Sequence, residues 1–161
     1  MQSECTICGQ MKRRKPVLAA FAKGYDLVLF VSGKNSANGK MLYEYCRSVN
    51  PITHWISGVK DIDPGWFAEV DSIGISGATS TSINQLQEVK EEVMFRAVRH
   101  KFRDPVLRRL LLETGDRVLR EASPQDEYWG IGPHGTGANR LGVLLMRLRD
   151  ELRVGGWPAR V

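Results

Sequence analysis

The stretch DLVLFVSGKNSANG, residues 26–39, decides the fold of this chain. It begins with a short, continuous apolar run, residues 26–31, of the kind that forms a strand buried on both faces of a parallel sheet. A loop of glycine, serine and asparagine, residues 32–39, then leads into a helical pattern. The order of strand, loop and helix is typical of a βαβ unit.

The same order recurs twice further along the chain. Residues 53–56 predict a second strand, followed by a helix that opens near Asp63, an N-cap residue with proline after it. Residues 72–75 predict a third strand, which runs into the small polar loop 76–82 and another helix. We therefore predict an α/β fold, in which a small parallel unit of three αβα layers has about three strands within residues 24–76.

Residues 87–161 predict helices and no strand. One helix is predicted over roughly Ile83 to Phe102. Close to the middle of this helix, the predominant basic residue of the chain changes from lysine to arginine. Residues 1–90 carry seven lysines and three arginines, whereas residues 91–161 carry one lysine and twelve arginines. We therefore predict two segments of different origin, an α/β segment over 1–90 and an all-helical segment over 91–161.

The composition excludes several classes of protein. The chain has 161 residues, of which 42% are hydrophobic, and a net charge of +5, and no apolar run approaches the ~20 residues that span a bilayer. The dense basic run at residues 12–15 has no aromatic neighbour to stack on bases, which favours a solvent-exposed helix start over nucleic-acid binding. Three cysteines cannot all pair with one another. We expect a soluble, cytoplasmic protein with neither a membrane nor a nucleic-acid partner.

Two loops share a design that suits an anion. Residues 32–39 and 76–82 each follow a buried strand, contain glycine and small polar residues, and open a helix. In a parallel sheet both lie at the carboxyl edge, where ligands of α/β sheets bind, and helix N-termini attract phosphate. Ser36, Asn38 and Ser80 are candidate donors to such a ligand. Serine and asparagine also cap helices without any ligand, so plain capped loops are the alternative.

Cys5 and Cys8 form a CxxC pair that has several interpretations. A structural zinc site requires four ligands, and the chain has neither a second CxxC nor paired histidines. A thioredoxin-like dithiol requires a preceding strand, and only four residues precede Cys5. Simple buried thiols are the plain alternative, and a ligand to an iron–sulfur cluster, which needs about three or four cysteines, stays open.

Three motifs in order along the chain carry a resemblance to a known family. They are TIC (6–8), VSGKNSANGKMLYEYC (31–46) and SIGISGATSTSINQLQEV (72–89). Over residues 4–90 the chain resembles the C-terminal part of 4-hydroxy-3-methylbut-2-enyl diphosphate reductase, the LytB family, which catalyses the last step of the non-mevalonate isoprenoid pathway. The resemblance implies an iron–sulfur oxidoreductase acting on an allylic diphosphate.

The resemblance assigns roles to the residues already singled out. It implies that Cys8 is a ligand of the iron–sulfur cluster and that Ser36, Asn38 and Ser80 bind the diphosphate. Met11 stands where the family has a substrate-side threonine, and Ala37 replaces a second serine. The two other cluster cysteines of the family have no counterpart, since Cys5 and Cys46 do not match their positions. We therefore expect no stable four-iron cluster in this chain, unless a partner chain supplies the missing part of the site.

The second segment resembles a different family, again through three motifs. They are FRAVRHKF (95–102), LLLETGDRVLREASPQDEYWGIG (110–132) and NRLGVLLMRLRDELR (139–153). Over residues 91–153 the chain resembles the C-terminal half of the NADAR family, whose members hydrolyse N-glycosidic bonds of riboflavin-pathway intermediates and ADP-ribosyl adducts. The resemblance implies a phosphoribosyl or ADP-ribosyl small molecule as ligand.

Four residues of this segment fall on NADAR motif positions near the family's pocket. The resemblance implies catalytic roles for Glu121, Asp126 and Trp129 and a substrate-binding role for Asn139. An N-glycosidase needs a carboxylate to orient water or to stabilise an oxocarbenium-like charge, and an aromatic ring to stack on the base. Asp126 and Trp129 are of the right types, three residues apart. The alternative is that Trp129 belongs to the core and Asp126 caps a turn.

Together these observations predict a partial, fused protein, with the two segments joined near residues 88–94 in one continuous helix. The reductase-like function is the first interpretation, because its segment is longer and has three ordered motifs. An NADAR-type N-glycosidase is the second interpretation. A non-catalytic diphosphate-binding module is the third, because both families' sites are incomplete in this sequence.

Overall fold

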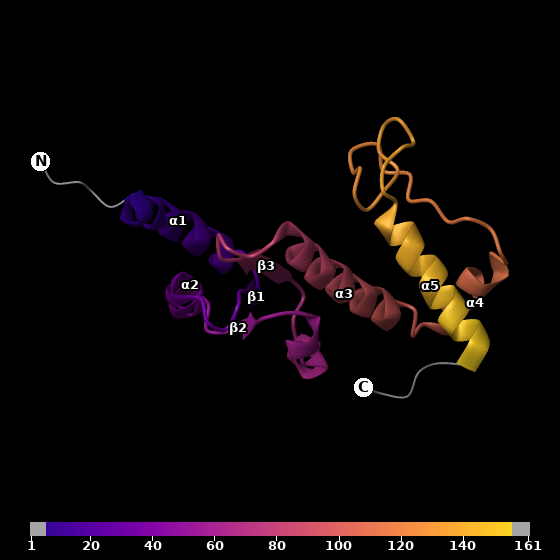
Figure 1. Cartoon of the computed structure of the whole chain (residues 1–161). Coiled ribbons are helices and arrows are strands. Elements are labelled where there is room, and N and C mark those ends of the chain that lie inside the picture. The colour runs from indigo at the N-terminus through magenta and orange to yellow at the C-terminus, as the bar shows by residue number, and fades with distance from the viewer. Residues whose placement is uncertain (1–5, 156–161) are drawn as a thin grey trace, which may run out of the picture. The chain divides into compact units, whose positions relative to one another are not determined.

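The computed structural model describes the backbone of residues 6–155 and the side chains of residues 14–155. The chain divides into two compact units, residues 1–90 and residues 91–161, which are described separately here. Figure 1 shows the order of their helices and strands along the chain. Within the described range, no helix is long and apolar enough to cross a membrane.

The first unit is built on a parallel sheet of three strands. These are β1 (Leu27–Val31), β2 (Thr53–Ile56) and β3 (Ile73–Gly77), in the order β2-β1-β3. Strand β1 pairs in parallel with both neighbours, and all five of its residues are buried. The predicted parallel sheet is confirmed, and its third strand begins one residue later and ends two residues later than the predicted strand 72–75.

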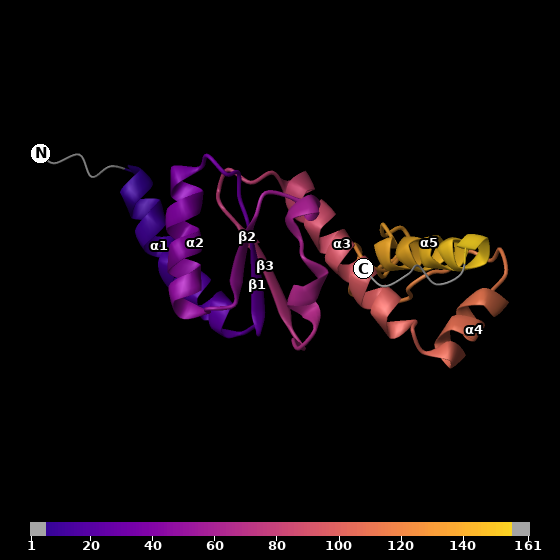
Figure 2. The same ribbon diagram turned by 90° about the horizontal axis from the view of Figure 1, so that it is seen from below.

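The sheet lies between two layers, as Figure 2 shows. Helices α1 (Thr6–Lys23) and α2 (Ala37–Val49) cover one face. Two short 3-10 turns and the first turns of α3 (Ile83–Lys101) cover the other. The predicted αβα arrangement is therefore confirmed. Its core on the α1–α2 side consists of Leu18, Ala22, Val28, Phe30, Leu42, Cys46 and Ala78.

The connection from β2 to β3 differs from the prediction of a helix near Asp63. It contains only the 3-10 turns Val59–Asp61 and Pro64–Phe67. Asp63 does cap the second turn, because its side chain accepts a hydrogen bond from Gly65 N at 2.8 Å. At the start of β3, Asp26 holds the backbone N–H groups of Asp71 and Ser72, at 3.1 and 2.8 Å.

The second unit packs the later turns of α3 against α4 (Pro105–Glu113) and α5 (Arg140–Gly155). Asp104 caps α4 by accepting from Val106 N at 2.8 Å and from Leu107 N at 3.0 Å. Residues 114–139, between α4 and α5, form neither helix nor strand. The buried core of this unit consists of Phe95, Val98, Leu111, Leu144, Leu148 and Leu152.

Candidate functional sites

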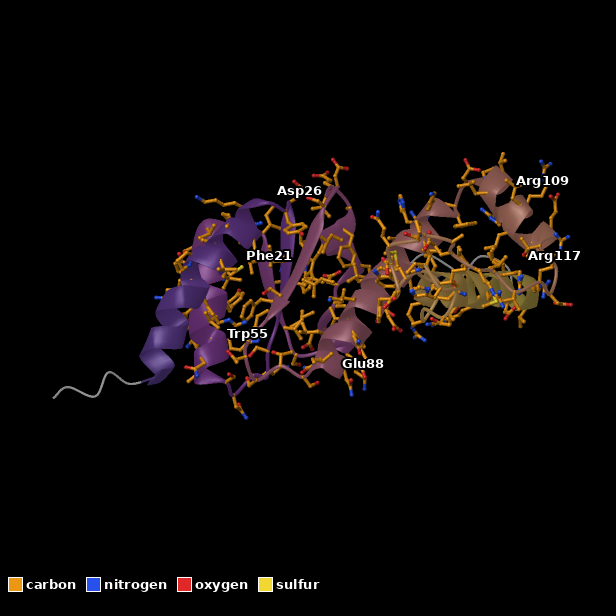
Figure 3. The ribbon with its side chains drawn as sticks, turned by 90° about the horizontal axis from the view of Figure 1, so that it is seen from above. Phe21, Asp26, Trp55, Glu88, Arg109 and Arg117 are labelled. Atoms are coloured by element: carbon orange, nitrogen blue, oxygen red, sulfur yellow. The ribbon has the colours of Figure 1, made fainter. Side chains whose placement is uncertain are left out.

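The three strands of the first unit end at one edge of the sheet, where α2 and α3 begin (Figure 2). Trp55, near this end of β2, donates its indole N–H to the carbonyl of Ser32 at 2.9 Å. Asp26 lies at the opposite edge, where β1 begins (Figure 3). The loops after β1 and β3 therefore share one side of the unit, as parallel strands require.

The loop after β1 places Ser36 and Asn38 at the N-terminus of α2. Ser36 is the N-cap residue, and its hydroxyl oxygen accepts a hydrogen bond from Gly39 N at 3.0 Å. Asn38 lies in the first turn, exposed to solvent. Ser36 thus acts as a helix cap, while the amide of Asn38 has no hydrogen bond within the described residues. Of the two candidate donors, Asn38 is therefore the one whose side chain is available to bind a ligand.

Ser32 is a polar residue at this helix start that the sequence did not single out. It is 0% exposed, and its hydroxyl has no hydrogen-bond partner in the part of the chain that the structure describes. It packs against Gly39 so closely that a Cβ at residue 39 would lie 2.9 Å from the Cβ of Ser32. Buried hydroxyls without partners are rare, because each costs about 1–3 kcal/mol. The start of α2 therefore offers an unused polar group.

The loop after β3 is fixed by two hydroxyl groups. Thr81 donates to the carbonyl of Val31 at 2.7 Å, and Ser82 accepts from Gln85 N at 3.1 Å as the cap of α3. Ser80, between β3 and this cap, is exposed, and no hydrogen bond to its side chain occurs among residues 14–155. The structure therefore brings Ser80 to the same edge as Ser36 and Asn38, with its hydroxyl free.

An arginine from α1 reaches the same loop. The guanidinium of Arg14 donates to the hydroxyl of Thr79 and, at 3.3 Å, to the carbonyl of Gly77. The sequence favoured a solvent-exposed helix start for the basic run 12–15, but Arg14 is half-buried. No local pattern could have indicated this contact, because its partners lie more than sixty residues further along the chain.

The loop after β2 carries a carboxylate that is already satisfied. Asp61 accepts from the backbone N–H of Ser57 at 2.7 Å and from its hydroxyl at 2.6 Å. These hydrogen bonds, followed by a smaller effect of the positive charge of Lys34, hold the pKa of Asp61 below its ordinary value. The loop after β2 therefore carries an ionised carboxylate whose oxygen is already used by Ser57.

The described cysteine and carboxylate residues do not form an iron–sulfur site. The side chain of Cys8 lies outside the described residues, although its backbone is part of α1. Cys46 is buried in the core, 3.8 Å from the Thr53 hydroxyl, and burial raises the pKa of its thiol. Within the described range, no three His, Cys, Asp or Glu side chains come together as a metal site. A cluster needs about three or four thiolates, so this donor set does not fit one.

In the second unit, Asp126 and Trp129 are brought together by a turn. Asp126 Oδ1 accepts from the backbone N–H groups of Tyr128 and Trp129, at 2.8 and 2.7 Å. The Trp129 ring packs against the core and meets Tyr128 edge-on, with ring centroids 5.0 Å apart. The structure therefore agrees with the plain alternative for Asp126, which caps a turn, and in part for Trp129, which is half-buried and packs against the core. Asp126 Oδ2 has no hydrogen bond among the described residues.

Glu121 and Asn139 are in direct contact. The amide of Asn139 accepts from Glu121 N at 2.9 Å and donates to the carbonyl of Leu119 at 2.8 Å. Its own backbone has a positive φ of 50°, which asparagine tolerates better than most residues. The Glu121 carboxylate accepts from Ser123 N at 3.0 Å. Both side chains thus hold the segment 114–139 together.

A three-residue network joins this segment to α3. Glu91 accepts from the Tyr128 hydroxyl at 2.8 Å and from Arg140 Nε at 2.7 Å, and its other oxygen pairs with the same guanidinium. The hydrogen bond from Arg140 lowers the pKa of Glu91. Burial, followed by the bond to Glu91, raises the pKa of Tyr128 to about 12. The sequence singled out none of these residues, and no short motif connects positions so far apart.

With this geometry in place, the chain can be compared with known proteins. Residues 1–94, more than half of the chain, match the family described as LytB protein. The chain belongs to the LytB family. Residues 65–153, again more than half, match the family described as NADAR domain, so the chain is also a member of that family. Both resemblances expected from the sequence are confirmed, and the two matches overlap over residues 65–94.

Individual relatives agree with the LytB assignment. The chain is 48% identical over 88 residues to the 4-hydroxy-3-methylbut-2-enyl diphosphate reductase of Bacteroides fragilis, covering 55% of this chain and 30% of that enzyme. It is 40% identical over 97 residues to the reductase of Chloroherpeton thalassium, covering 57% of this chain and 31% of that enzyme. The chain thus spans just under a third of the length of these relatives.

A solved structure of (E)-4-hydroxy-3-methyl-but-2-enyl diphosphate reductase, described as the terminal enzyme of the non-mevalonate pathway, resembles this LytB-family chain. Their similarity has a TM-score of 0.50 with 30% sequence identity, and it covers 52% of this chain and 30% of the solved one. The α/β fold class predicted from the sequence is therefore that of a LytB protein over part of its length.

Proposed function

We propose that residues 1–90 form a diphosphate-binding portion of a 4-hydroxy-3-methylbut-2-enyl diphosphate reductase-like protein of the isoprenoid pathway. The observation that carries the proposal is the shared carboxyl edge of the sheet, at which the exposed Asn38 and Ser80 lie near the starts of α2 and α3 respectively. The relatives that match this part of the chain are named for a diphosphate substrate.

The chemistry of this edge suits a diphosphate. The first N–H groups of a helix have no partner within the helix and carry a partial positive charge, which attracts phosphate oxygens. Asn38 contributes an amide donor and Ser80 a hydroxyl donor, both exposed. Ser36 fixes the start of α2 through its bond to Gly39 N, so we assign it the role of shaping the site. The plain alternative of two capped loops shares these contacts, and only a binding measurement separates the two.

We propose binding, without a reduction step, for the residues present. An iron–sulfur cluster would supply electrons to an allylic diphosphate, but the thiol of Cys46 is in the core. Cys8 stays a proposed ligand by resemblance only. We also propose that the chain fuses two family segments through α3, because the LytB and NADAR matches overlap over residues 65–94, which include its beginning.

Calorimetry on the full chain tests the proposed binding, with an allylic diphosphate as titrant. Asn38→Ala and Ser80→Ala each remove one donor to a charged group, so we expect each to weaken binding about ten- to a hundredfold. Backbone N–H groups remain, so neither change should abolish binding. Ser48→Ala is the matched control, because Ser48 donates to Tyr45 O in the last turn of α2, away from the site.

The outcomes separate the interpretations. Weakened binding in the two site variants, with the control unchanged, supports the diphosphate site. Equal affinity in all variants would mean that the loops are only capped turns. A folded parent chain that binds no diphosphate would contradict the proposal for these residues.

A second candidate is an NADAR-type N-glycosidase in residues 91–161. It is favoured by the Asp126 carboxylate, in which Oδ1 holds the turn and Oδ2 is free of hydrogen bonds within residues 14–155. Such an oxygen suits the orientation of a water molecule, with Trp129 beside it to stack on a base. Glu121 and Asn139 are proposed to shape the pocket for a phosphoribosyl or ADP-ribosyl compound.

Asp126→Asn separates catalysis from turn formation. The asparagine oxygen can still accept from Tyr128 N and Trp129 N, whereas the negative charge is lost. We expect this variant to fold as the parent does and to lose the release of free base or ribose phosphate from an ADP-ribosyl or phosphoribosyl compound. A parent chain that releases neither product would contradict this second function.

A further inference from the structure

We infer that Arg14 is a further anion-binding residue of the diphosphate site and supplies a positive charge to the loop after β3, which has no basic residue of its own. The inference rests on the proposed diphosphate site and adds a residue that neither the sequence motifs nor the helix caps include. It assigns the phosphate groups of that diphosphate a position beside the end of β3.

The position of Arg14 is the first argument. Its guanidinium crosses from α1 to the loop after β3, where it donates to the Thr79 hydroxyl and to the Gly77 carbonyl at 3.3 Å. Thr79 immediately precedes Ser80, one of the proposed diphosphate donors. The side chain is thereby held in place before any ligand arrives, which reduces the entropy lost on binding.

The charge of Arg14 is the second argument. Both of its partners are neutral oxygens, and no carboxylate pairs with Arg14 within the described part of the chain. The acidic side chain at the same edge, Asp61, is already occupied by Ser57. A guanidinium has five N–H donors and stays charged at all relevant pH values. Donors beyond the two in use are therefore available to phosphate oxygens, which arginine binds strongly.

The starts of the two helices add an independent observation. At α2, the fully buried Ser32 hydroxyl has no partner among the described residues, and it lies beside the first turn. The described edge thus combines an unsatisfied buried hydroxyl with an unpaired, fixed cation.

Calorimetry with inorganic pyrophosphate on the full chain tests the role of Arg14. Arg14→Gln keeps a hydrogen-bonding side chain but removes the charge, and we expect affinity to fall about ten- to a hundredfold. Arg14→Lys keeps the charge, and we expect it to restore most of the affinity. Lys23→Gln is the matched control, because it removes one charge from the last turn of the same helix, and we expect no change.

A second variant separates the charge from the loop contact. Thr79→Val removes the hydroxyl that Arg14 contacts and leaves the charge in place, so we expect a smaller loss of affinity than in Arg14→Gln. Thermal unfolding of each variant checks that the first unit is folded. If Arg14→Gln fails to fold, Arg14→Lys and Thr79→Val still test the inference, because only the first should keep near-parent affinity.

Each remaining outcome has a definite meaning. If Ser80→Ala weakens pyrophosphate binding and Arg14→Gln does not, the inference is wrong while the diphosphate site stands. If Thr79→Val and Arg14→Gln weaken binding equally, Arg14 acts only by holding the loop, which also overturns the inference. If the folded parent binds no pyrophosphate, the proposed site and the role of Arg14 fail together.

Discussion

The two candidate sites use polar side chains in opposite ways. At the carboxyl edge of the sheet, Asn38 and Ser80 are exposed and make no hydrogen bonds within residues 14–155, because strands and helix caps already hold the backbone. In residues 114–139, which have neither helix nor strand, Asp126 and Asn139 themselves hold the backbone.

Substitutions in the two units should therefore have different consequences. Where regular structure supports a loop, removing a polar side chain should affect ligand binding and leave stability almost unchanged. Where the side chains support the loop, the same removal should first destabilise the unit. A loss of activity in the second unit is therefore informative only if the variant keeps the supporting hydrogen bonds.

We expect the largest effect on stability when asparagine is replaced by alanine in the second unit, and almost none when the same replacement is made in the first. Asn139→Ala loses two hydrogen bonds to backbone groups and places alanine at a φ of 50°. We expect the free energy of unfolding of the second unit to fall by about 3 kcal/mol. Asn38→Ala, at an exposed helix position, should change the stability of the first unit by less than about 0.5 kcal/mol. Urea denaturation followed by circular dichroism measures both.

A partial replacement sharpens this result. Asn139→Asp keeps an oxygen that can accept from Glu121 N but cannot donate to the Leu119 carbonyl. We expect its stability to lie between that of the parent and that of Asn139→Ala. Equal stability of Asn139→Ala and Asn38→Ala would remove the contrast between the two sites.

The next effect concerns tight packing in the first unit. Gly39→Ala should destabilise it by about 1–3 kcal/mol, although alanine favours helices, because the new Cβ would meet Ser32 Cβ at 2.9 Å and Ser36 Cβ at 3.0 Å. Gly33→Ala is the control, since nothing lies within 4 Å of its Cβ position. Thermal unfolding compares the two. If the Gly39→Ala chain is as stable as the Gly33→Ala chain, the start of α2 can accommodate a Cβ at residue 39 and the packing argument is wrong.

A pH effect tests the network in the second unit. The pKa of Tyr128 is about 12, raised first by burial and then by Glu91. Its stabilising contribution is full below the ordinary value of 10.0 and lost as the pH rises through about 12. We expect ultraviolet absorbance to show a late-titrating phenol that Tyr128→Phe removes. Glu91→Gln should lower the pKa of Tyr128 only in part, because burial remains, and an unchanged value would contradict the role of Glu91.

The smallest expected effect is a change in the pKa of one exposed carboxylate, that of Asp26. Hydrogen bonds from the Ser72 hydroxyl, followed by the backbone N–H groups of Ser72 and Asp71, lower the pKa of Asp26. Ser72→Ala should move this pKa upward, part of the way to its ordinary value, because the two N–H donors remain. NMR titration of side-chain carboxyl groups measures the shift. Asp61, at the opposite edge, should titrate as in the parent chain and is the internal control.

Much of the first unit could be predicted because its signals are local. The apolar run before Ser32 indicated a strand buried on both faces, and all five residues of β1 are buried. Ser36 is a helix cap, one of the two roles its residue type allowed. The helix expected to open at Asp63 is present as the four-residue 3-10 turn Pro64–Phe67, with Asp63 as its cap.

The sites could be predicted only in part, for a related physical reason. Residue type and spacing marked Asp126 and Trp129 as a pair, and the structure joins them through a turn. Arg14 and Glu91 act on residues 65 and 37 positions away, respectively. Such contacts depend on how helices pack in the folded chain, so they cannot be predicted from a short stretch of sequence. The roles of the eight site residues named from the sequence stay predictions for the binding and activity assays.

Helix α3 has a consequence for cooperativity. It runs without interruption over Ile83–Lys101, and the boundary between the two units falls inside it, after Lys90. Backbone hydrogen bonds from i to i−4 therefore cross the boundary, and a helix propagates more easily than it nucleates. We therefore expect residues 83–101 to gain and lose their helical structure as one segment.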